Sequence, residues 1–166
     1  RPDQVHFSQS LAEDVKRRDL TINALAMTKD GMIVDYISGM ADIENKIIRA
    51  VGEPSARMEE DPLRILRALR FQATLGFSVE GDTAIALHAK CHLLHKISSE
   101  RIWNEFVGLL CGEHVAEVLL QYEDIIGVIF PDILPMIGCN QHNPHHRFDV
   151  WEHTVETVKN IPAQKT

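Results

Sequence analysis

The sequence predicts a mainly α-helical fold, and three observations lead to this prediction. The second half of the chain repeats the apolar spacing of amphipathic helices between polar or proline-containing ends. β-like residues are confined to a strand candidate at residues 5–8 and to residues 28–37, where Lys-Asp-Gly between apolar runs predicts a hairpin. No internal repeat or low-complexity tract interrupts the pattern. The predicted helices cover residues 10–27, a short segment after residue 39, residues 61–75, 82–95, 99–111 and 113–122, and a last helix that begins near residue 149.

The composition excludes several classes of protein. The chain has 166 residues, enough for one or two domains with a hydrophobic core, and its net charge of −7 argues against a surface coated with basic residues. No apolar run approaches the ~20 residues that cross a bilayer. The three cysteines, Cys91, Cys111 and Cys139, form no C-x-x-C motif, which excludes a disulfide framework and favours a reducing, cytoplasmic environment.

The stretch RRDLTIN, residues 17–23, places two arginines, an aspartate and an asparagine beside an apolar run. If one helix continues through it, Asp19 and Asn23 lie on one face; if the helix breaks near Arg18, Asp19 caps a second helix instead. Paired guanidinium donors suit phosphate, and Asp and Asn suit sugar hydroxyls. The alternative is a capped helix with an intrahelical ion pair. The apolar stripe expected beside this cluster consists of Leu11, Val15, Ile22 and Leu25.

The stretch EEDPLRILRALRF, residues 59–71, predicts a helix with Asp61 as its N-cap and Pro62 at its first position. Helical spacing places Arg64 on an apolar face, where an unpaired charge is costly. Its partner is Glu60 or Asp61, or else Asp61 and Arg64 together present acceptors and donors to the edge of a base.

The rest of this helix is expected to form part of the core. The face of Arg64 continues with Ala68, Phe71 and Leu75, while Arg67 lies on another side with Leu63, Arg70 and Thr74. The core positions expected to pack against the helices at residues 83–95 and 102–110 are Leu66 and Leu69.

In combination, these stretches resemble the bacterial class II tRNA nucleotidyltransferases, the family of the CCA-adding enzymes and their poly(A) polymerase relatives. EDVKRRDLTINALAM, residues 13–27, matches the family's R-R-D-x-x-x-N motif. YISGMADIENKIIRAVGEPSARMEEDPLRILRALRFQATLGF, residues 36–77, resembles its D…G…D-L linker, its E-D-x-x-R motif and its R-A-x-R-F run. ISSERIWNEF, residues 97–106, resembles a helix start of the family. The resemblance covers about residues 1–130.

The resemblance implies a domain order and a reaction. It places the end of a nucleotidyltransferase α/β head at residues 1–57, a helical neck that binds RNA and nucleotide at residues 58–130, and a linker with the start of an HD-type domain at residues 131–166. The intact enzyme transfers CMP and AMP from CTP and ATP to the 3′ end of tRNA. The motifs are shared by enzymes that add CCA, CC, A or poly(A), so this choice stays open.

The resemblance also assigns nucleotide-binding roles. Arg18, Asp19 and Asn23 match the positions that hold the triphosphate and ribose. The positions that match the motif reading the Watson–Crick edge of C or A are Glu60, Asp61 and Arg64. The positions that resemble the linker allowing the pocket to change between C and A are Asp35, Gly39 and Asp42, although SGMAD stands where the family often has Gly-Gly.

The family's reaction uses Mg²⁺ held by a D-x-D pair upstream of R-R-D. The sequence contains no D-x-D. The catalytic carboxylates are therefore expected upstream of Arg1, no catalytic residue is assigned within this chain, and the chain alone is expected to be inactive.

Histidines suggest further metal chemistry. HHRFDVWEHTVETV resembles the entry to an HD-type phosphohydrolase domain, in which His153 is the first metal ligand, but no His-Asp pair follows before Thr166. Two other groups have types and spacings that can bind a metal but are expected to be solvated, packed or polar loop residues, namely His88, His92 and His95 on one helix face, and His142, His145 and His146 in a loop. Three alternatives remain: an HD-type phosphohydrolase, a non-catalytic helical RNA- or protein-binding module, and a structural neck without a ligand.

Overall fold

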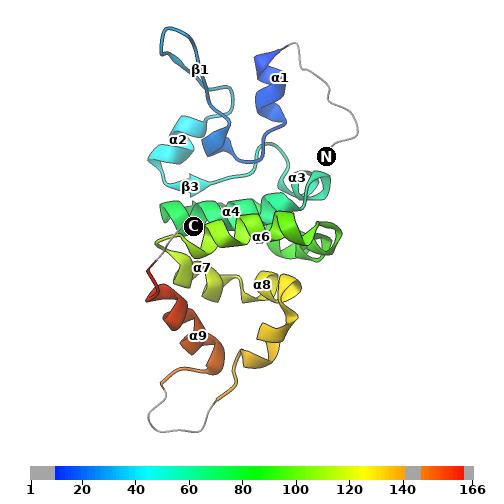
Figure 1. The fold of residues 1–166 in the computed structure, drawn as a ribbon. Helices are drawn as coiled ribbons and strands as arrows, with labels where there is room; N and C mark the ends of the chain where they lie inside the picture. The colour runs from blue at the N-terminus through cyan, green and yellow to red at the C-terminus, as the bar shows by residue number, and fades with distance from the viewer. Residues whose placement is uncertain (1–9, 141–146, 163–166) are drawn as a thin grey trace.

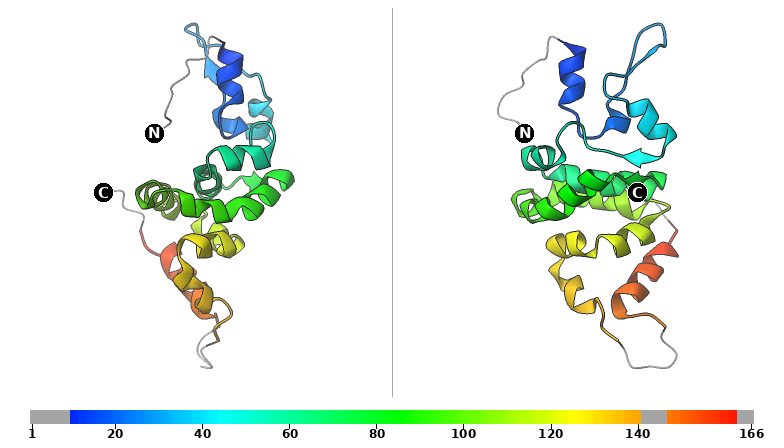
Figure 2. Two further views of the ribbon diagram at one scale, coloured as in Figure 1. Left: turned by 90° about the vertical axis from the view of Figure 1, so that its right-hand side faces the viewer. Right: turned by 180° about the vertical axis from the view of Figure 1, so that it is seen from behind.

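Short helices stack in three layers along one axis of the molecule (Figure 1). This computed structural model describes residues 10–140 and 147–162, so the strand candidate at residues 5–8 lies outside the described residues. The side and rear views keep the same order of layers (Figure 2). The main core of buried apolar side chains, from Leu20 to Val155, runs through the stack, and a smaller cluster of Val15, Ala24 and Val51 lies in the first layer. The order of elements, mostly helices, confirms a mainly helical fold.

The first layer contains the N-terminal elements. Helix α1 (Leu11–Lys16) is followed by a 3₁₀ turn, η1 (Thr21–Asn23). Strands β1 (Ala26–Met27) and β2 (Ile33–Val34) pair antiparallel, which confirms the predicted hairpin. Helix α2 (Gly39–Glu44) then packs against η1.

The helix predicted over residues 10–27 is broken. Helix α1 ends at Lys16, and residues 19–21 instead pair with residues 49–51 through an antiparallel bridge and two backbone hydrogen bonds of 2.9 Å. Asp19 and Asn23 therefore do not share a helix, and the alternative with a break near Arg18 is the correct one. The N-cap of η1 is Leu20, so Asp19 does not cap it as expected.

The apolar stripe expected beside this cluster is only partly correct. Val15 is buried, and Ile22 and Leu25 are partly buried. Leu11 is 46% exposed, because the short helix α1 turns its first residue away from the core.

The middle layer is built around α4 (Leu63–Leu75) and α6 (Ser99–Leu110), which pack along each other. Helix α3 (Pro54–Glu60) packs against α5 (Gly81–Lys90), which leads into the 3₁₀ helix η2 (Cys91–Lys96). The predicted helices at residues 61–75, 82–95 and 99–111 are thus confirmed, with the second ending in a 3₁₀ turn.

A second strand pair joins the first two layers. Strand β3 (Ile47–Ile48) runs parallel to β4 (Ser78–Val79). The expectation that residues 28–37 form the only β-like region within the described chain was wrong, because a pair of two-residue strands gives no alternating pattern long enough to recognise.

Helix α4 buries the two leucines predicted for the core. Leu66 and Leu69 are fully buried, and α4 packs against α6, as predicted, and against α7, whereas it makes little contact with α5, the helix predicted over residues 82–95. The apolar face predicted through Arg64 was only partly correct, since Leu75 at its end is 42% exposed. The buried face is rotated toward Ile65, so Arg64 lies at its edge rather than at its centre.

The start of α4 lies one residue later than predicted. Pro62 is its N-cap, and Asp61 is the last residue associated with α3. The Asp61 carboxylate still satisfies a free amide of the new helix, because its Oδ1 accepts from the Leu63 backbone N–H at 3.2 Å.

The third layer consists of α7 (Val115–Gln121), α8 (Glu123–Ile129), the 3₁₀ helix η3 (Pro131–Met136) and α9 (Val150–Lys159). A capping box formed by Asp149 and Glu152 starts α9, as the last predicted helix requires. Within the described ranges, no helix is long and apolar enough to span a bilayer.

Candidate functional site

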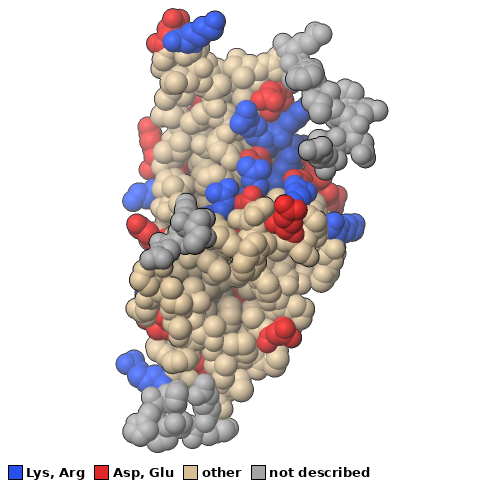
Figure 3. All heavy atoms as spheres, viewed as in Figure 1, with Lys and Arg blue, Asp and Glu red and all other residues tan. Residues whose placement is uncertain are grey.

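The two charged stretches singled out in the sequence meet where the first layer contacts the middle layer. The Arg64 Nη2 group donates to the Arg17 carbonyl at 3.2 Å, and Arg57 Nη1 donates to the Lys16 carbonyl at 3.3 Å. Figure 3 shows basic side chains, with acidic ones among them, gathered on the face where α1 approaches α3 and α4. The fold therefore brings residues 16–19 and 57–67 together, although about 40 residues separate them.

Arg64 is held by three acceptors. Its Nη1 group contacts Glu60 Oε2 at 2.9 Å and the Arg57 carbonyl at 3.0 Å, in addition to the contact of Nη2 with Arg17. The Arg64 side chain is 13% exposed, and Glu60 also pairs with Arg57 at 2.7 Å. Of the two local partners considered for Arg64, Glu60 is therefore the observed one.

Asp61 has separate partners. Its Oδ2 atom accepts from Arg101 Nη2 of α6 at 3.0 Å, while its Oδ1 atom accepts from the Leu63 amide. Asp61 and Arg64 thus stand side by side at the start of α4, each held by its own charged neighbour. A carboxylate offers about four acceptor positions and a guanidinium five donors, so both groups keep capacity for a further partner.

The Asp19 carboxylate lies next to Arg67 of α4. The carboxyl is 6% exposed, its Oδ1 accepts from the Leu20 amide at 3.0 Å, and its Oδ2 lies 2.9 Å from Arg67 Nε. This Arg67 contact is an ion pair that lacks hydrogen-bond geometry. The buried carboxylate thereby has an opposite charge beside it.

Arg18 and Asn23 complete the first charged stretch. Arg18 is exposed and pairs with Asp14 at 3.2 Å, a surface contact that is worth little and is easily exchanged for another anion. Asn23 Oδ1 is buried without a hydrogen-bond partner.

Unsatisfied polar atoms concentrate at this junction. Among the described residues, six buried side-chain polar atoms lack a hydrogen-bond partner, and four of them belong to Asp19, Asn23, Arg57 and Arg67. Buried polar groups without partners are uncommon and call for an explanation, such as a role in binding.

The linker residues fold onto the turn that carries Asn23. The Asp42 carboxylate accepts from Thr21 Oγ1 at 2.6 Å and from Arg49 Nε at 3.1 Å. Gly39 lies so close to this turn that a Cβ atom would stand 2.3 Å from the Thr21 carbonyl oxygen. Only glycine therefore fits at this position without displacing η1.

Asp35 organises the loop before α2. Its carboxylate accepts backbone N–H groups of Ile37, Gly39 and Met40 at 2.9–3.1 Å. The hydrogen bond from Met40, supported by those from the other amides, outweighs burial and lowers the pKa of Asp35.

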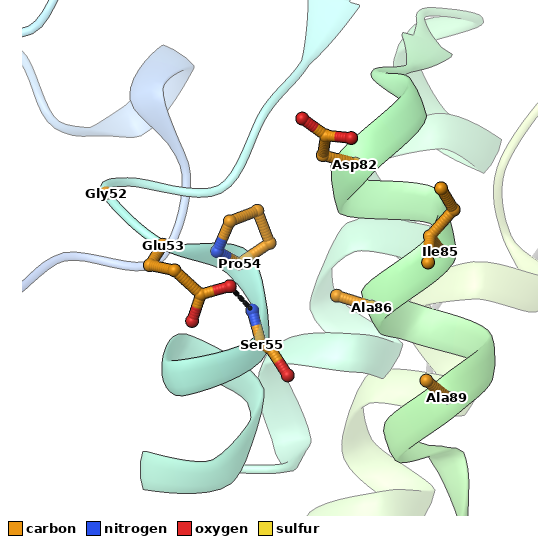
Figure 4. Close-up of a pocket in the computed structure, with 8 residues that line it drawn as sticks. All are labelled: Gly52, Glu53, Pro54, Ser55, Asp82, Ile85, Ala86 and Ala89. Carbon is orange, nitrogen blue, oxygen red and sulfur yellow. Dashed lines mark hydrogen bonds between the residues drawn. The ribbon is translucent and has the colours of Figure 1, made fainter.

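A separate groove lies between residues 52–55 and α5 (Figure 4). It has a volume of about 590 Å³, with Gly52 and Pro54 on one side and Ile85 and Ala89 on the other. The nearby Glu53 carboxylate caps α3 by accepting from Ser55 N at 3.0 Å. None of the predicted nucleotide-binding residues lines this groove.

In the first histidine group, His88 and His92 contact different partners. His88 Nδ1 pairs with Asp124 at 2.7 Å and its ring stacks on Tyr122 at 5.3 Å, while His92 Nδ1 contacts the Ala89 carbonyl. Across residues 10–140 and 147–162, no three His, Cys, Asp or Glu side chains are grouped as metal ligands.

The second histidine group and the HD-type candidate lie near the end of the chain. His142, His145 and His146 fall outside the described residues. His153 is exposed on α9, where it lines a surface hollow of about 550 Å³ together with Glu156.

Sequence reasoning missed the arginines that organise this junction. Arg57, Arg67 and Arg101 hold Glu60, Asp19 and Asp61 respectively. For Arg67, the spacing of three residues from Arg64 was the available signal, because residues three apart are neighbours on the surface of a helix.

Two family models and several curated proteins match this chain. Residues 1–49 match the family model described as Poly A polymerase head domain, and residues 76–137 match the one described as "Probable RNA and SrmB- binding site of polymerase A". The CCA-adding enzyme of Ligilactobacillus salivarius is 52% identical over 124 residues, which are 75% of this chain and 31% of that protein. The CCA-adding enzyme of Bacillus subtilis is 47% identical over 133 residues, 76% of this chain and 34% of that protein.

Solved structures give the same result. The CCA-adding enzyme of Bacillus stearothermophilus in complex with CTP is 46% identical with a TM-score of 0.67, over 68% of this chain and 29% of that one. The Thermotoga maritima CCA-adding enzyme complexed with tRNA is 28% identical with a TM-score of 0.67, over 73% of this chain and 31% of that one. The chain thus spans about a third of the length of the relatives that it matches.

Proposed function

This chain belongs to the nucleotidyltransferase family of the CCA-adding enzymes, and from that membership we propose that it is the nucleotide-selecting and RNA-binding part of an enzyme that adds CMP and AMP to the 3′ end of tRNA. In this proposal CTP, ATP and tRNA are its partners. The observation that carries the proposal is the convergence of residues 17–23 with residues 60–67 at one junction.

Base selection is assigned to the first turn of α4. Cytosine and adenine both present an amino donor next to a ring-nitrogen acceptor on the Watson–Crick edge. Asp61 supplies an acceptor for the amino group, and Arg64 supplies donors for the ring nitrogen. Uracil and guanine present the reverse order of donor and acceptor, so the same pair rejects them. The partners Glu60 and Arg101 hold the two side chains in the order that this discrimination needs.

The phosphates and the ribose are assigned to the first layer. The exposed Arg18 provides a planar guanidinium for the triphosphate, since its contact with Asp14 is weak. Asp19 and Asn23 provide acceptors for ribose hydroxyls, which fits the buried unsatisfied oxygens at both positions. We propose that Asp42 and Gly39 position the turn that carries Asn23.

The metal of the reaction is a separate matter. We propose that the enzyme uses Mg²⁺, which supplies charge for nucleotidyl transfer. The described residues offer no group of three metal-ligating side chains, and the sequence has no D-x-D, so the part of the chain that the structure describes does not fit the ion. The roles proposed here for binding and base selection do not involve the metal.

The proposal also includes domain boundaries and a cellular location. We propose the domain boundaries 1–57, 58–130 and 131–166 for head, neck and the segment that follows. We also propose a cytoplasmic enzyme, a location that suits the free cysteines Cys91 and Cys111 in the part of the chain that is described.

The test uses the enzyme that contains this chain, Mg²⁺, and a tRNA transcript that lacks its three terminal nucleotides. With all four nucleoside triphosphates offered separately and together, we expect incorporation of C and then A, with U and G rejected. Failure to extend the tRNA with CTP and ATP under conditions in which the protein is folded contradicts the proposal.

A further inference from the structure

Arg67 contacts the first charged stretch but belongs to the second. Its Nε atom lies 2.9 Å from Asp19 Oδ2, and the two residues are 36% and 6% exposed. The pair joins α4 of the middle layer to the segment that precedes η1. It is the contact through which α4, which carries Arg64 and begins just after Asp61, reaches the carboxylate assigned to the ribose.

The backbone around Asp19 is already fixed. Its carbonyl accepts from the Val51 amide at 2.9 Å, and the Thr21 amide donates to the Arg49 carbonyl at 2.9 Å. One side-chain oxygen is held by the Leu20 amide. The remaining freedom of the carboxyl group is rotation about its side-chain bonds, and Arg67 is the charged group beside the oxygen that would move.

We propose that Arg67 is a positioning residue for ribose recognition, acting through Asp19. This inference rests on the proposed function, because it takes Asp19 as the acceptor of a ribose hydroxyl. Arg67 offsets the charge of the buried carboxylate and fixes its rotation, so that its free acceptor positions face the ribose. Without the guanidinium, the carboxylate turns toward water or toward another donor, and the hydroxyl loses its aligned acceptor.

Discrimination between ribose and deoxyribose is the property that this role controls. A purely structural ion pair changes stability and leaves the preference for CTP over 2′-deoxy-CTP intact. A positioning role lowers that preference, because 2′-deoxy-CTP never used the hydroxyl contact. Loss of a hydrogen bond to a charged group corresponds to about a ten- to hundredfold change in the ratio of the two kcat/KM values.

The chain offers a matched control on the same helix. Arg70 lies one turn after Arg67 and makes a comparable ion pair, with its Nε 2.6 Å from Glu105 Oε2 and side chains 29% and 18% exposed. This pair lies within the middle layer, between α4 and α6, and touches none of the proposed nucleotide-binding residues. Arg70→Gln therefore removes an ion pair from the same helix, one that also has hydrogen-bond geometry, without affecting Asp19.

The experiment measures addition to tRNA of CMP from CTP and of dCMP from 2′-deoxy-CTP by wild-type enzyme, Arg67→Gln, Arg70→Gln and Asp19→Asn, with melting temperatures of the same samples. We expect Arg67→Gln to lower the CTP preference at least tenfold, mainly through KM for CTP, and Arg70→Gln to leave it unchanged. Adding Arg67→Gln to Asp19→Asn should change the preference no further, because the first residue acts through the second.

Several results would overturn the inference. An unchanged preference in Arg67→Gln, or an equal loss in Arg70→Gln, removes the positioning role. If Arg67→Gln does not fold, the preference is read in Arg67→Lys, where a point charge in place of a planar fork should lower it a few-fold, and an unchanged value again counts against Arg67. A wild-type enzyme that adds no CMP contradicts the proposed function itself. If the wild-type enzyme adds CMP and Arg67→Gln has the same preference for CTP over 2′-deoxy-CTP, only this inference is contradicted.

Discussion

Replacing Arg64 by alanine should separate base reading from structure. The side chain is 13% exposed and makes one ion pair and two hydrogen bonds to carbonyl groups. Glu60 is 47% exposed and keeps Arg57 as a partner, so the lost ion pair contributes at most about 1 kcal/mol. Each carbonyl bond contributes a net of about 0.5–1.5 kcal/mol. We therefore expect the free energy of unfolding to fall by about 2–3 kcal/mol.

The effect on nucleotide choice should be larger than this loss of stability suggests. The assay uses the enzyme that contains this chain, and a loss of about 2–3 kcal/mol out of a typical stability of about 5–15 kcal/mol leaves it folded at 25 °C. The missing guanidinium should lower the ratios of kcat/KM for CTP and ATP over UTP and GTP by about ten- to a hundredfold. The assay is steady-state extension of tRNA with each of the four nucleotides, with Tm measured on the same sample.

Arg70→Ala is the control, because Arg70 forms a similar ion pair with Glu105 but contacts no proposed nucleotide-binding residue. It should lower Tm by a similar amount and leave the four ratios at wild-type values. If Arg64→Ala also leaves the ratios unchanged, Arg64 serves only to hold the end of α1 against α3, and the base-reading role is refuted.

Three further predictions concern stability. Leu69→Ala should cost about 2–5 kcal/mol in urea unfolding, since Leu69 is fully buried, and a loss below about half a kilocalorie would contradict its place in the core. Gly39→Ala should cost about 1–3 kcal/mol, because its Cβ would stand 2.3 Å from the Thr21 carbonyl oxygen, and an unchanged thermal melt would refute this contact. Burial, with a smaller effect of Asp124, raises the pKa of Tyr122 to about 12, so its stabilising contribution is complete below pH about 10 and is lost as the pH rises through about 12. The difference in unfolding free energy between wild type and Tyr122→Phe should therefore shift by about 1 kcal/mol against wild type from pH 9 to pH 11, and a constant difference would count against the raised pKa.

The sequence predicted the elements that local rules control. The helices of the middle layer followed from apolar spacing, and the hairpin of β1 and β2 followed from its Lys-Asp-Gly turn. The break after α1 was one of two alternatives, because local rules do not show that residues 19–21 pair with residues 49–51. The parallel pair of β3 and β4 was missed for the same reason, since each strand has two residues and its stability comes from its partner.

The arginines of α4 show why the site was only partly predictable. Arg64, Arg67 and Arg70 recur every third residue of the helix, and each pairs with a carboxylate. The partner of Arg64 is Glu60, four residues before it, which helical spacing predicts. The partners of Arg67 and Arg70 lie 48 residues before and 35 residues after them, and no spacing rule relates such positions.

Because the ion pairs of Arg67 and Arg70 join residues that are distant in the sequence, α4 connects separate parts of the junction. Three ion pairs from α4 reach the last residue of α3, the segment before η1 and the neighbouring helix α6. The nucleotide-binding candidates on α4 and on the first layer are therefore linked by a single rigid element rather than by a flexible loop. A nucleotide that contacts Asp61 and Asp19 together would bind to groups whose separation is fixed by Arg67 before it arrives. Such preorganisation would lower the entropic cost of binding a nucleotide in the proposed position.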